Sequence, residues 1–467
     1  MMADSLFTLE NAVDAVSGRF VGASCGASVT GVSIDTRTLA GGDLFVALPG
    51  EKTDGHAYLK AAFEAGAAGA LADVDKWELL PLEIREAGPF ILVKDPLAAL
   101  QELARWYLDR YSSVLKIAVT GSNGKTTTKE LLASILRNHR PTYASSGNYN
   151  SEIGLPLSVF GLRHEHLFGV FEFGTNRQGE IPLLASILKP NIALVTNIGT
   201  AHIGMFGSRE AIADEKGGIF SSFDSLSRGL IREDEPFASR LLAGKRGTFG
   251  SFGPGSTPGV EKVEYRGLEG SIIHFKGQQI KLRLPGEHNV MNACAAISVA
   301  QLCGAEDNSI IRGIEEVSPS FGRSEFISGD ISLYQDCYNS NPESLRAGLD
   351  TIKSSGWTRG RRVGVFGSMK ELGSLEKELH EEAGRVCAAS GFDAWFFLGP
   401  EARYAYSAYK AAGGNSAFWS AEDVKLKADL LEYVRPGDLV YLKGSRALGL
   451  ERIAEALQEG SVRRQVC

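Results

Sequence analysis

The sequence predicts an α/β protein of several domains, and three observations support this. Apolar runs of strand length alternate with helix-length stretches along most of the chain, the pattern of parallel sheets. From Gly244 to Pro285 this pattern gives way to short alternating segments between glycine-rich turns, which is typical of antiparallel strands. The length of 467 residues suffices for roughly three domains at about 150 residues each. We expect three α/β domains over residues 1–112, 113–317 and 318–467.

Composition and charge exclude several classes of protein. Charged residues make up 22% of the chain and the apolar set AVILMFWYC 43%, which is too apolar for a disordered chain. The formal net charge is −7 and no long Lys/Arg run occurs, so we expect no nucleic-acid partner. No apolar stretch reaches the roughly 18 residues of a membrane span, and Met1–Val16 lacks the pattern of a signal peptide. A cytoplasmic protein that is not inserted in a membrane is expected.

Six cysteines lie far apart and form no CxxC pair: Cys25, Cys294, Cys303, Cys337, Cys387 and Cys467. Spacing of this kind is not typical of a zinc site. We therefore expect reduced thiols, as in a cytosolic protein, and no bound zinc.

Local patterns predict the individual elements of the first two domains. Apolar residues at helical spacing predict a helix over 97–111 that closes the first domain. The second domain opens with an apolar strand at 114–119, and further strands are expected at 169–173 and 192–195. The antiparallel part, over 244–285, is expected inside this domain.

A linker over 317–322 is expected to lead into the third domain. Three apolar runs there, at 363–366, 394–398 and 439–442, each end in a glycine-containing turn. Helical stretches separate these runs, which predicts a Rossmann-like α/β domain with a ligand at the carboxyl ends of its strands.

The strongest functional signal is the loop Thr120-Gly121-Ser122-Asn123-Gly124-Lys125-Thr126-Thr127, between an apolar strand and an amphipathic helix. Its glycines let backbone N–H groups face phosphate oxygens, and the helix N-terminus adds partial positive charge. Lys125 can reach the β- and γ-phosphates, and the Thr126 hydroxyl can bind Mg²⁺. Val119 stands where the common GxxxxGK[ST] motif has its first glycine, so the loop is a shorter variant. We expect a P-loop ATPase-like central domain, and the absence of an NKxD sequence favours ATP over GTP.

Three further side chains of the central domain are candidates for the site. Glu172 ends an apolar run in which an unpaired carboxylate would be costly to bury, so we favour a metal ligand over a structural ion pair. His202 follows another strand, and its position alone favours a hydrogen-bonded structural histidine. Lys216 lies in an apolar helical stripe, so it either points inward or extends its ammonium group to solvent.

Taken in order, these motifs resemble those of the Mur ligases, the ATP-dependent amide-forming enzymes of peptidoglycan precursor assembly. The likeness covers nearly the whole chain and is greatest to the member that adds D-alanyl-D-alanine to UDP-N-acetylmuramoyl-tripeptide. Besides the loop, it rests on Asp35-Thr36-Arg37, Asp54-Gly55-His56, Gly147–Pro156, Glu172–Arg177, Asn197–His202, Gly286–Ala293, Gly322-Arg323, Asp336–Pro342, Gly367–Gly373 and Lys443–Arg446. Thr36 replaces the serine, and Ser151 the second asparagine, that the family usually has.

The resemblance implies roles for individual residues. Glu172 and His202 would join Thr126 around Mg²⁺, and Lys216 would be the lysine that the family carbamylates to hold a second Mg²⁺. The other implied contacts are His288, Asn289 and Asn292 with adenine, Arg323 and Asp336 with ribose and phosphate, Thr36 and Arg37 with the UDP-sugar, and Asn148 and Asn150 with the γ-phosphate, the role of Ser151 being open. Asn339 and Asn341 would belong to the closing third domain, which binds the incoming amino substrate.

The implied reaction makes an acyl phosphate from ATP and the tripeptide carboxylate. The amino group of D-alanyl-D-alanine then attacks it, so that ADP and phosphate are released. A diaminopimelate- or lysine-adding Mur ligase and a folylpolyglutamate synthetase-like ligase are alternatives within the family. A P-loop ATPase without ligase activity is an alternative of another class. Tyr338–Ser344 lacks the Asp-Asn-Pro-Arg sequence of the diaminopimelate-adding enzymes, and a monomer is expected.

Overall fold

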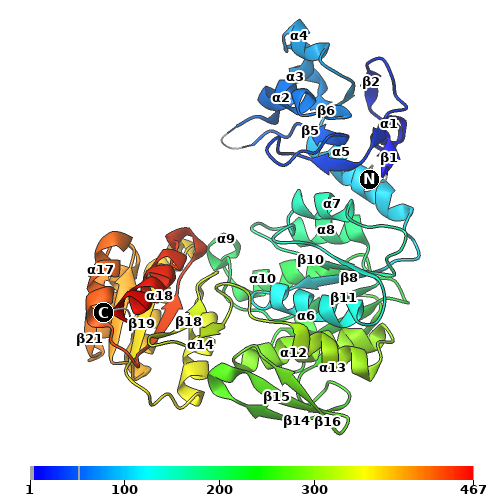
Figure 1. The fold of residues 1–467 in the computed structure, drawn as a ribbon. Helices are drawn as coiled ribbons and strands as arrows, with labels where there is room; N and C mark the ends of the chain where they lie inside the picture. The colour runs from blue at the N-terminus through cyan, green and yellow to red at the C-terminus, as the bar shows by residue number, and fades with distance from the viewer. Residues whose placement is uncertain (1–4, 51–52, 466–467) are drawn as a thin grey trace. The chain divides into compact units, whose positions relative to one another are not determined.

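The structure is a computed structural model that describes residues 5–50 and 53–465 (Figure 1). It divides into two compact units. The first comprises the chain up to Ala118 with Pro141–Thr175 and Gly179–Asn191, and the second comprises Val119–Arg140, Asn176–Gln178 and the chain from Ile192 on. Both units are mixed α/β with parallel sheets, as the sequence predicts. The domain boundaries at residues 112 and 317 stay predictions.

The first unit begins with a five-stranded sheet in the order β2-β7-β6-β5-β4. Its strands are β2 (Arg19–Val21), β4 (Gly31–Ser33), β5 (Asp43–Val46), β6 (Gly69–Asp73) and β7 (Phe90–Val93), and only the edge strand β2 is antiparallel to its neighbour. Phe45, Ala70 and Phe90 are buried on one face of this sheet against Leu59 of α2 (Leu59–Glu64). The other elements before residue 95 are β1 (Phe7–Thr8), α1 (Leu9–Val16), β3 (Ser28–Val29), η1 (Gly55–Tyr58), α3 (Val74–Glu78) and α4 (Leu82–Arg85).

Helix α5 (Pro96–Asp109) confirms the helix expected over 97–111. The Asp95 carboxylate accepts hydrogen bonds from the first-turn amides, and a proline at the first helical position costs no hydrogen bond there. This helix contacts α7 (Gly154–Val159) and α8 (Glu180–Leu188). The strands that complete the unit are in the order β8-β10-β9, with bounds β8 (Leu115–Thr120), β9 (Thr142–Ala144) and β10 (Phe168–Glu172).

The second unit contains three parallel strands in the order β11-β12-β13. Their bounds are β11 (Ile192–Val195), β12 (Arg228–Arg232) and β13 (Thr248–Phe252). Helix α6 (Lys125–Arg137) packs against α12 (Glu287–Leu302) and α13 (Asp307–Glu316). The shorter helices here are α9 (Ile203–Phe206), α10 (Arg209–Gly217), η2 (Gly218–Phe220) and α11 (Ala238–Leu242).

The antiparallel part expected over 244–285 is shorter than the sequence predicts. It forms a three-stranded sheet of β14 (Val260–Tyr265), β15 (Ser271–Phe275) and β16 (Gln278–Leu282), with η3 (Gly267–Glu269) between the first two. The residues before it were assigned wrongly, because β13 pairs in parallel with β12. Phe249 of β13 packs against Phe220 and Phe223, with ring centroids 5.3 and 6.1 Å from its own. These partners are distant from Phe249 in the sequence, so a local pattern does not reveal the contact.

The C-terminal part of the second unit is a six-stranded sheet in the order β17-β18-β22-β19-β20-β21. Its strands are β17 (Glu325–Ile327), β18 (Ser332–Asp336), β19 (Arg362–Gly367), β20 (Ala394–Leu398), β21 (Ser416–Ser420) and β22 (Leu439–Lys443), and only β17 is antiparallel. These bounds confirm the three strands expected in this domain. The expected linker at 317–322 lies between α13 and β17, outside helices and strands.

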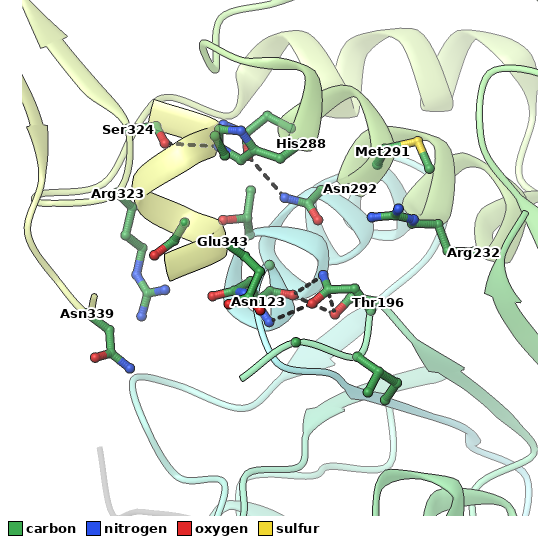
Figure 2. A pocket seen from close by; sticks show the side chains of 18 of the residues that line it. Asn123, Thr196, Arg232, His288, Met291, Asn292, Arg323, Ser324, Asn339 and Glu343 are labelled. Atoms are coloured by element: carbon green, nitrogen blue, oxygen red, sulfur yellow. Dashed lines mark hydrogen bonds between the residues drawn. The ribbon is translucent and has the colours of Figure 1, made fainter. Parts of the chain in front are cut away.

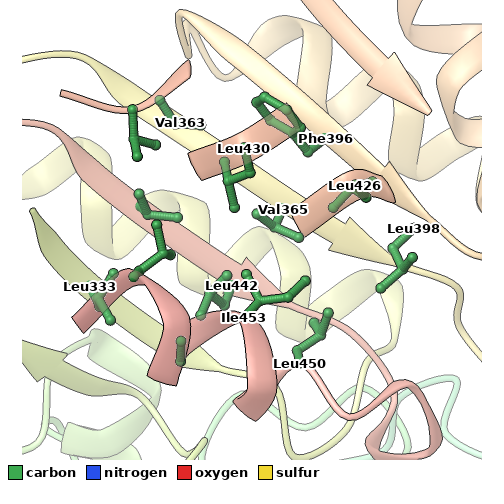
Figure 3. Close-up of a cluster of buried hydrophobic side chains, with 14 of the residues drawn as sticks. Leu333, Val363, Val365, Phe396, Leu398, Leu426, Leu430, Leu442, Leu450 and Ile453 are labelled. Carbon is green, nitrogen blue, oxygen red and sulfur yellow. The ribbon is translucent and has the colours of Figure 1, made fainter. Parts of the chain in front are cut away.

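Helices cover both faces of this C-terminal sheet. On one face, α17 (Asp423–Tyr433) and α18 (Glu451–Gln465) pack through Leu426, Leu430 and Ile453 on Val363, Val365 and Phe396 of the sheet (Figure 3). On the other face lie α14 (Pro342–Ser354), α15 (Glu376–Ala389) and α16 (Ala402–Ala411), and two short helices, η4 (Gly373–Leu375) and η5 (Arg446–Leu448), follow strands β19 and β22.

Five cysteines of the described chain have free thiols, and Cys467 lies outside the described residues, as do the first four residues of Met1–Val16. Burial raises the pKa of the Cys294, Cys303 and Cys337 thiols to about 12, which keeps them protonated near neutral pH. Within residues 5–50 and 53–465, no helix has the length and apolar character to cross a membrane.

Candidate active site

The loop between β8 and α6 requires glycine at two positions. Gly121 and Gly124 have φ angles of +147° and +81°, which side chains other than glycine rarely adopt. A Cβ atom on Gly121 would lie 1.8 Å from Oγ1 of Thr196, and one on Gly124 would lie 2.3 Å from Oδ1 of Asn292. Helix α6 begins directly afterwards at Lys125, so its positive N-terminal end faces the loop.

The residues after β11 hold this loop in place. Ser122 N donates to the Asn197 carbonyl (2.9 Å), and Asn123 N donates to Oδ1 of the same asparagine (3.0 Å). Lys125 Nζ donates to the carbonyl oxygen of Gly121 at 2.9 Å, which places its ammonium group across the loop. The loop is therefore a braced strand–turn–helix unit with a cation at its mouth, the geometry that binds phosphate groups.

A cavity of about 360 Å³ opens beside the loop (Figure 2). Its volume lies within the range of ligand pockets, and backbone amides, carboxamides and charged groups converge on it. The residues proposed from the sequence that line it are Asn123, Gly124, Thr127, His288, Asn289, Asn292, Arg323, Asp336 and Asn339. The structure thus brings residues from the loop, from the start of α12 and from the C-terminal sheet to one cavity.

Hydrogen bonds order the side chains at the start of α12. The Asn292 amide donates to Oδ1 of Asn289 (3.0 Å), and its own Oδ1 accepts from the Thr128 hydroxyl (3.2 Å). His288 Nε2 lies 3.2 Å from Oγ of Ser324. Burial lowers the pKa of His288, so its imidazole is neutral at pH 7. This side of the cavity therefore offers neutral hydrogen-bonding groups, which suit a nucleobase.

Charged groups line the part of the cavity that the C-terminal sheet contributes. The Arg323 guanidinium lies 3.6 Å from the ring centroid of Tyr338. Lys443 is buried, and its Nζ donates to Oδ2 of Asp336 (2.7 Å) and to the carbonyl of Asn339 (2.9 Å). Lys443 therefore fixes the ends of two neighbouring strands. Tyr338 and Lys443 lie in motifs that the sequence singled out, but neither was proposed as a site residue.

The sequence also missed a polar pair on the β12 side of the cavity. Glu235 and Arg209 both line it, and both bind the backbone of Ile198. Glu235 Oε2 accepts from the amide of Ile198 at 3.0 Å, and Arg209 donates to its carbonyl at 2.8 Å. Because Glu235 follows the carboxyl end of a parallel strand, its position was a usable signal.

Lys216 points inward, as one of the two interpretations of its position predicts. It lies on α10 with only 2% of its surface exposed. Burial, and then the positive charge of Lys125, lower its pKa well below the ordinary value for lysine. The lowered pKa increases the fraction of Lys216 that is a neutral, nucleophilic amine.

His202 contacts the C-terminal part of the second unit. Its Nδ1 lies 2.5 Å from Oε2 of Glu371, and this contact lowers the pKa of the Glu371 carboxyl. Asn341 makes a comparable link, because its amide donates to Oδ1 of Asn123 in the phosphate loop (2.8 Å). Asn341, which was proposed from the sequence, thus reaches the phosphate loop, whereas the contact with His202 comes from Glu371, which was not proposed as a site residue.

Thr126 lies in the first turn of α6, and several other proposed residues lie in the first unit. Glu172 is buried at the end of β10, and its Oε1 accepts from the Asn150 amide (2.8 Å). The Ser151 hydroxyl accepts from the amide of Gly154 (3.1 Å), so it organises the start of α7. Asn148 is exposed, as is Arg37. Arg37 pairs with Asp35, which lowers the pKa of that carboxyl to about 2, and Thr36 lies between these two residues.

These features define an α/β nucleotide-binding protein with a phosphate loop at the carboxyl end of a parallel sheet. Three family models match the chain: the Mur ligase family, catalytic domain over residues 28–107, the Mur ligase middle domain over 119–300, and the Mur ligase, glutamate ligase domain over 322–446. The chain belongs to the Mur ligase family.

Individual relatives match it over nearly its whole length. The chain is 37% identical to the UDP-N-acetylmuramoyl-tripeptide–D-alanyl-D-alanine ligase of Treponema pallidum, across 97% of this chain and 99% of that protein. The fold is similar to that of MurF from Acinetobacter baumannii, with a TM-score of 0.87 and 30% identity over 98% of this chain and all of that one. It is also similar to MurF ligase from Thermotoga maritima in complex with ADP, with a TM-score of 0.79 and 28% identity over 93% and 98% of the two chains. The resemblance found in the sequence is confirmed.

Proposed function

We infer that the protein is an ATP-dependent ligase that adds D-alanyl-D-alanine to UDP-N-acetylmuramoyl-tripeptide in peptidoglycan precursor synthesis. One observation carries this inference: a single cavity is lined by residues of the phosphate loop, of the start of α12 and of the C-terminal sheet. The full-length similarity to ligases of that name supports the choice of substrates. We place the protein in the cytoplasm as a monomer that binds no nucleic acid.

ATP would bind with its phosphates on Gly121–Thr127 and its base in the cavity. Lys125 would neutralise charge on the γ-phosphate during transfer, which is the main demand of phosphoryl transfer. The adenine would contact His288, Asn289 and Asn292, which all line the cavity. The ribose and phosphates would lie on the side of Arg323 and Asp336.

The donor set proposed for Mg²⁺ consists of the Thr126 hydroxyl, the Glu172 carboxylate, the His202 imidazole and a carbamylated Lys216. No group of three or more His, Cys, Asp or Glu side chains is arranged to hold a metal within the described chain, so the set depends on the hydroxyl and the carbamate. Lys216 fits carbamylation: its lowered pKa leaves an amine lone pair that forms an N–C bond to CO₂, with release of one proton. Two bound Mg²⁺ ions would stabilise the phosphate charge.

The remaining residues would bind the two other substrates. Thr36 and Arg37 would contact the UDP-sugar, and Asn148 and Asn150 would lie toward the γ-phosphate. The tripeptide carboxylate would take the γ-phosphate to form an acyl phosphate, which is a far better electrophile. The D-alanyl-D-alanine amine would form the new C–N bond as phosphate leaves, with Asn339 and Asn341 in the part of the chain that binds it. Water must be excluded from the site during these steps, because it would hydrolyse the acyl phosphate.

Product analysis by mass spectrometry tests this function. Purified protein with ATP, UDP-N-acetylmuramoyl-tripeptide and D-alanyl-D-alanine should give the UDP-muramoyl pentapeptide and one phosphate per amide bond. A panel with diaminopimelate, lysine and glutamate as acceptors separates the alternative ligases. Amide formation with one of those amines alone, or phosphate release that needs neither substrate, would overturn the proposal.

A further inference from the structure

His202 is in contact with a loop that comes from the C-terminal sheet. We call this loop, residues 368–375 between β19 and α15, the docking loop. Oε2 of Glu371 lies 2.5 Å from His202 Nδ1, and the carbonyl of Glu371 accepts from the amide of Gly204 at 3.1 Å. The docking loop thus holds both the side chain of His202 and the backbone two residues after it.

Both partners of this contact have unusual backbone conformations. His202 has φ +62° and Glu371 has φ +64°, the left-handed region, which is unfavourable for a residue with a Cβ atom. Residues are kept in this region when the surrounding structure demands it, and such positions cluster at functional sites. Because both residues of this contact have such a conformation, we infer that the contact has a functional role.

The two backbones approach too closely for any side chain at two glycines. A Cβ atom on Gly204 would lie 2.3 Å from the amide nitrogen of Gly373, and one on Gly373 would lie 2.8 Å from Cα of Gly204. Helix α9 contacts η4 at this point. The glycines therefore allow His202 and Glu371 to meet.

The docking loop is ordered from within its own domain. The amide of Met369 donates to Nε2 of the buried His380 (3.0 Å), and Nδ1 of this histidine donates to the carbonyl of Glu376 (2.7 Å). The amide of Lys370 donates to Oγ of Ser445 (3.1 Å). These hydrogen bonds fix the residues just before Glu371, so its carboxylate is held where His202 meets it.

We propose that Glu371 is a positioning residue that orients the His202 imidazole. The carboxylate oxygen that contacts Nδ1 would hold the proton on this nitrogen, which would leave the lone pair on Nε2. A carboxylate that holds the second nitrogen of a ligand histidine fixes both its tautomer and its ring angle. This inference rests on the proposed role of His202, and it makes the orientation of that residue depend on docking of the C-terminal domain.

Substitution of Glu371 tests the proposal in kinetics. Glu371→Ala should lower kcat about 10- to 100-fold, with an unchanged melting temperature and an unchanged KM for ATP. Glu371→Gln should recover most of the rate, because its amide oxygen still accepts from Nδ1–H. Glu378→Gln, an exposed carboxylate on the following helix, is the matched control and should be silent. A fully active Glu371→Ala enzyme would overturn the proposal.

Two further measurements separate positioning from a merely structural role. In a His202→Gln background, Glu371→Ala should have no additional effect on kcat, whereas an undiminished effect would contradict action through His202. The ¹⁵N spectrum of His202 in the full-length protein should show Nδ1–H and an unprotonated Nε2, and Glu371→Ala should mix the tautomers. If His202→Gln is fully active, the proposed role of His202 fails, and an unchanged spectrum in Glu371→Ala would still refute positioning.

Discussion

Two loops of the second unit share one topology but differ in what they bind. The phosphate loop follows β8 and leads into α6, and the docking loop follows β19 and leads through η4 into α15. In the phosphate loop, glycines at positive φ turn the chain straight into a helix at Lys125, and that helix end points its dipole at the turn. In the docking loop, His380 and Ser445 accept hydrogen bonds from the backbone amides of Met369 and Lys370, respectively.

The difference shows that a strand–turn–helix unit is not an anion site by topology alone. In the docking loop, side chains accept hydrogen bonds from the backbone amides of the turn, so these amides do not face a ligand. The turn instead supports an outward-facing group, the carboxylate of Glu371. The phosphate loop is suited to bind a ligand, whereas the docking loop is suited to hold a residue of another part of the chain. Substitutions in the two loops should therefore have different kinetic signatures.

The largest effect is expected at the cation of the phosphate loop. Lys125→Ala should reduce turnover by about 10³-fold or more, because it removes the ammonium charge that would stabilise the phosphoryl-transfer transition state. Phosphate release with all three substrates measures this. Lys353→Ala, which removes an exposed lysine of α14, should leave the rate unchanged. Near-normal ligation by Lys125→Ala would show that the loop is not catalytic.

Two matched glycine substitutions, one in each loop, test directly whether the phosphate loop and the docking loop differ in function. Gly124→Ala should weaken ADP binding at least about tenfold, because the new methyl group meets Asn292 and the φ angle is unfavourable. Gly373→Ala should leave ADP affinity unchanged and lower kcat, because it pushes the docking loop from Gly204. Titration calorimetry and steady-state kinetics give the two quantities.

Gly413→Ala is the control for backbone strain in this pair. Gly413 also has a positive φ, of +77°, but a Cβ atom there meets nothing within 4 Å. It should lower stability slightly and leave both binding and kcat unchanged. If Gly124→Ala and Gly373→Ala give the same signature, the two loops do not differ in function as proposed.

A smaller effect is expected on the ribose side of the cavity. Arg323→Ala removes a guanidinium that stacks on Tyr338 and lines the cavity, so KM for ATP should rise about fivefold, as expected for about 1 kcal/mol. The kcat should change little. Arg359→Ala, which removes a comparable stack on Trp357 away from the cavity, should not change KM. A rise in KM for D-alanyl-D-alanine alone would contradict nucleotide contact.

The smallest effect concerns the pH dependence of the docking loop. Burial lowers the pKa of His380 below its usual 6.5, so the folded state binds fewer protons than the unfolded state near that pH. Its contribution to stability is therefore complete above pH 6.5 and is lost as the pH falls toward the lower folded pKa, by at most about 1.4 kcal/mol per pH unit. Urea unfolding at pH 7.5 and 5.5 should show a smaller pH difference for His380→Gln than for wild type. An equal pH difference in His380→Gln and in wild type would show that His380 does not contribute to the pH dependence of stability.

Local signals predicted much of the fold and part of the site. The bounds of β11 and β20 agree with the expected strands because each is a continuous apolar run between turn residues. Helical spacing placed Lys216 in an apolar stripe but left open whether its ammonium group points inward or to solvent, and the structure shows the inward position. The phosphate loop was identifiable because its glycines and its lysine lie within seven consecutive residues, so the whole motif can be found in one short segment of the sequence.

Contacts between distant segments could not be predicted in this way. Strand β13 was placed in the antiparallel part because the glycine-rich pattern begins at Gly244, and its parallel pairing depends on β12, which lies earlier in the chain. Glu371 and Glu235 act on His202 and Ile198 across long stretches of chain. Ser151 occupies a position that is usually asparagine in the family, and its helix-start hydrogen bond is visible only in three dimensions.

The most direct test is a crystal structure of the full-length protein with a non-hydrolysable ATP analogue. We expect a triphosphate along Gly121–Thr127 and a base in the cavity beside Asn289 and Arg323. An analogue bound elsewhere, with this loop and cavity empty, would contradict it.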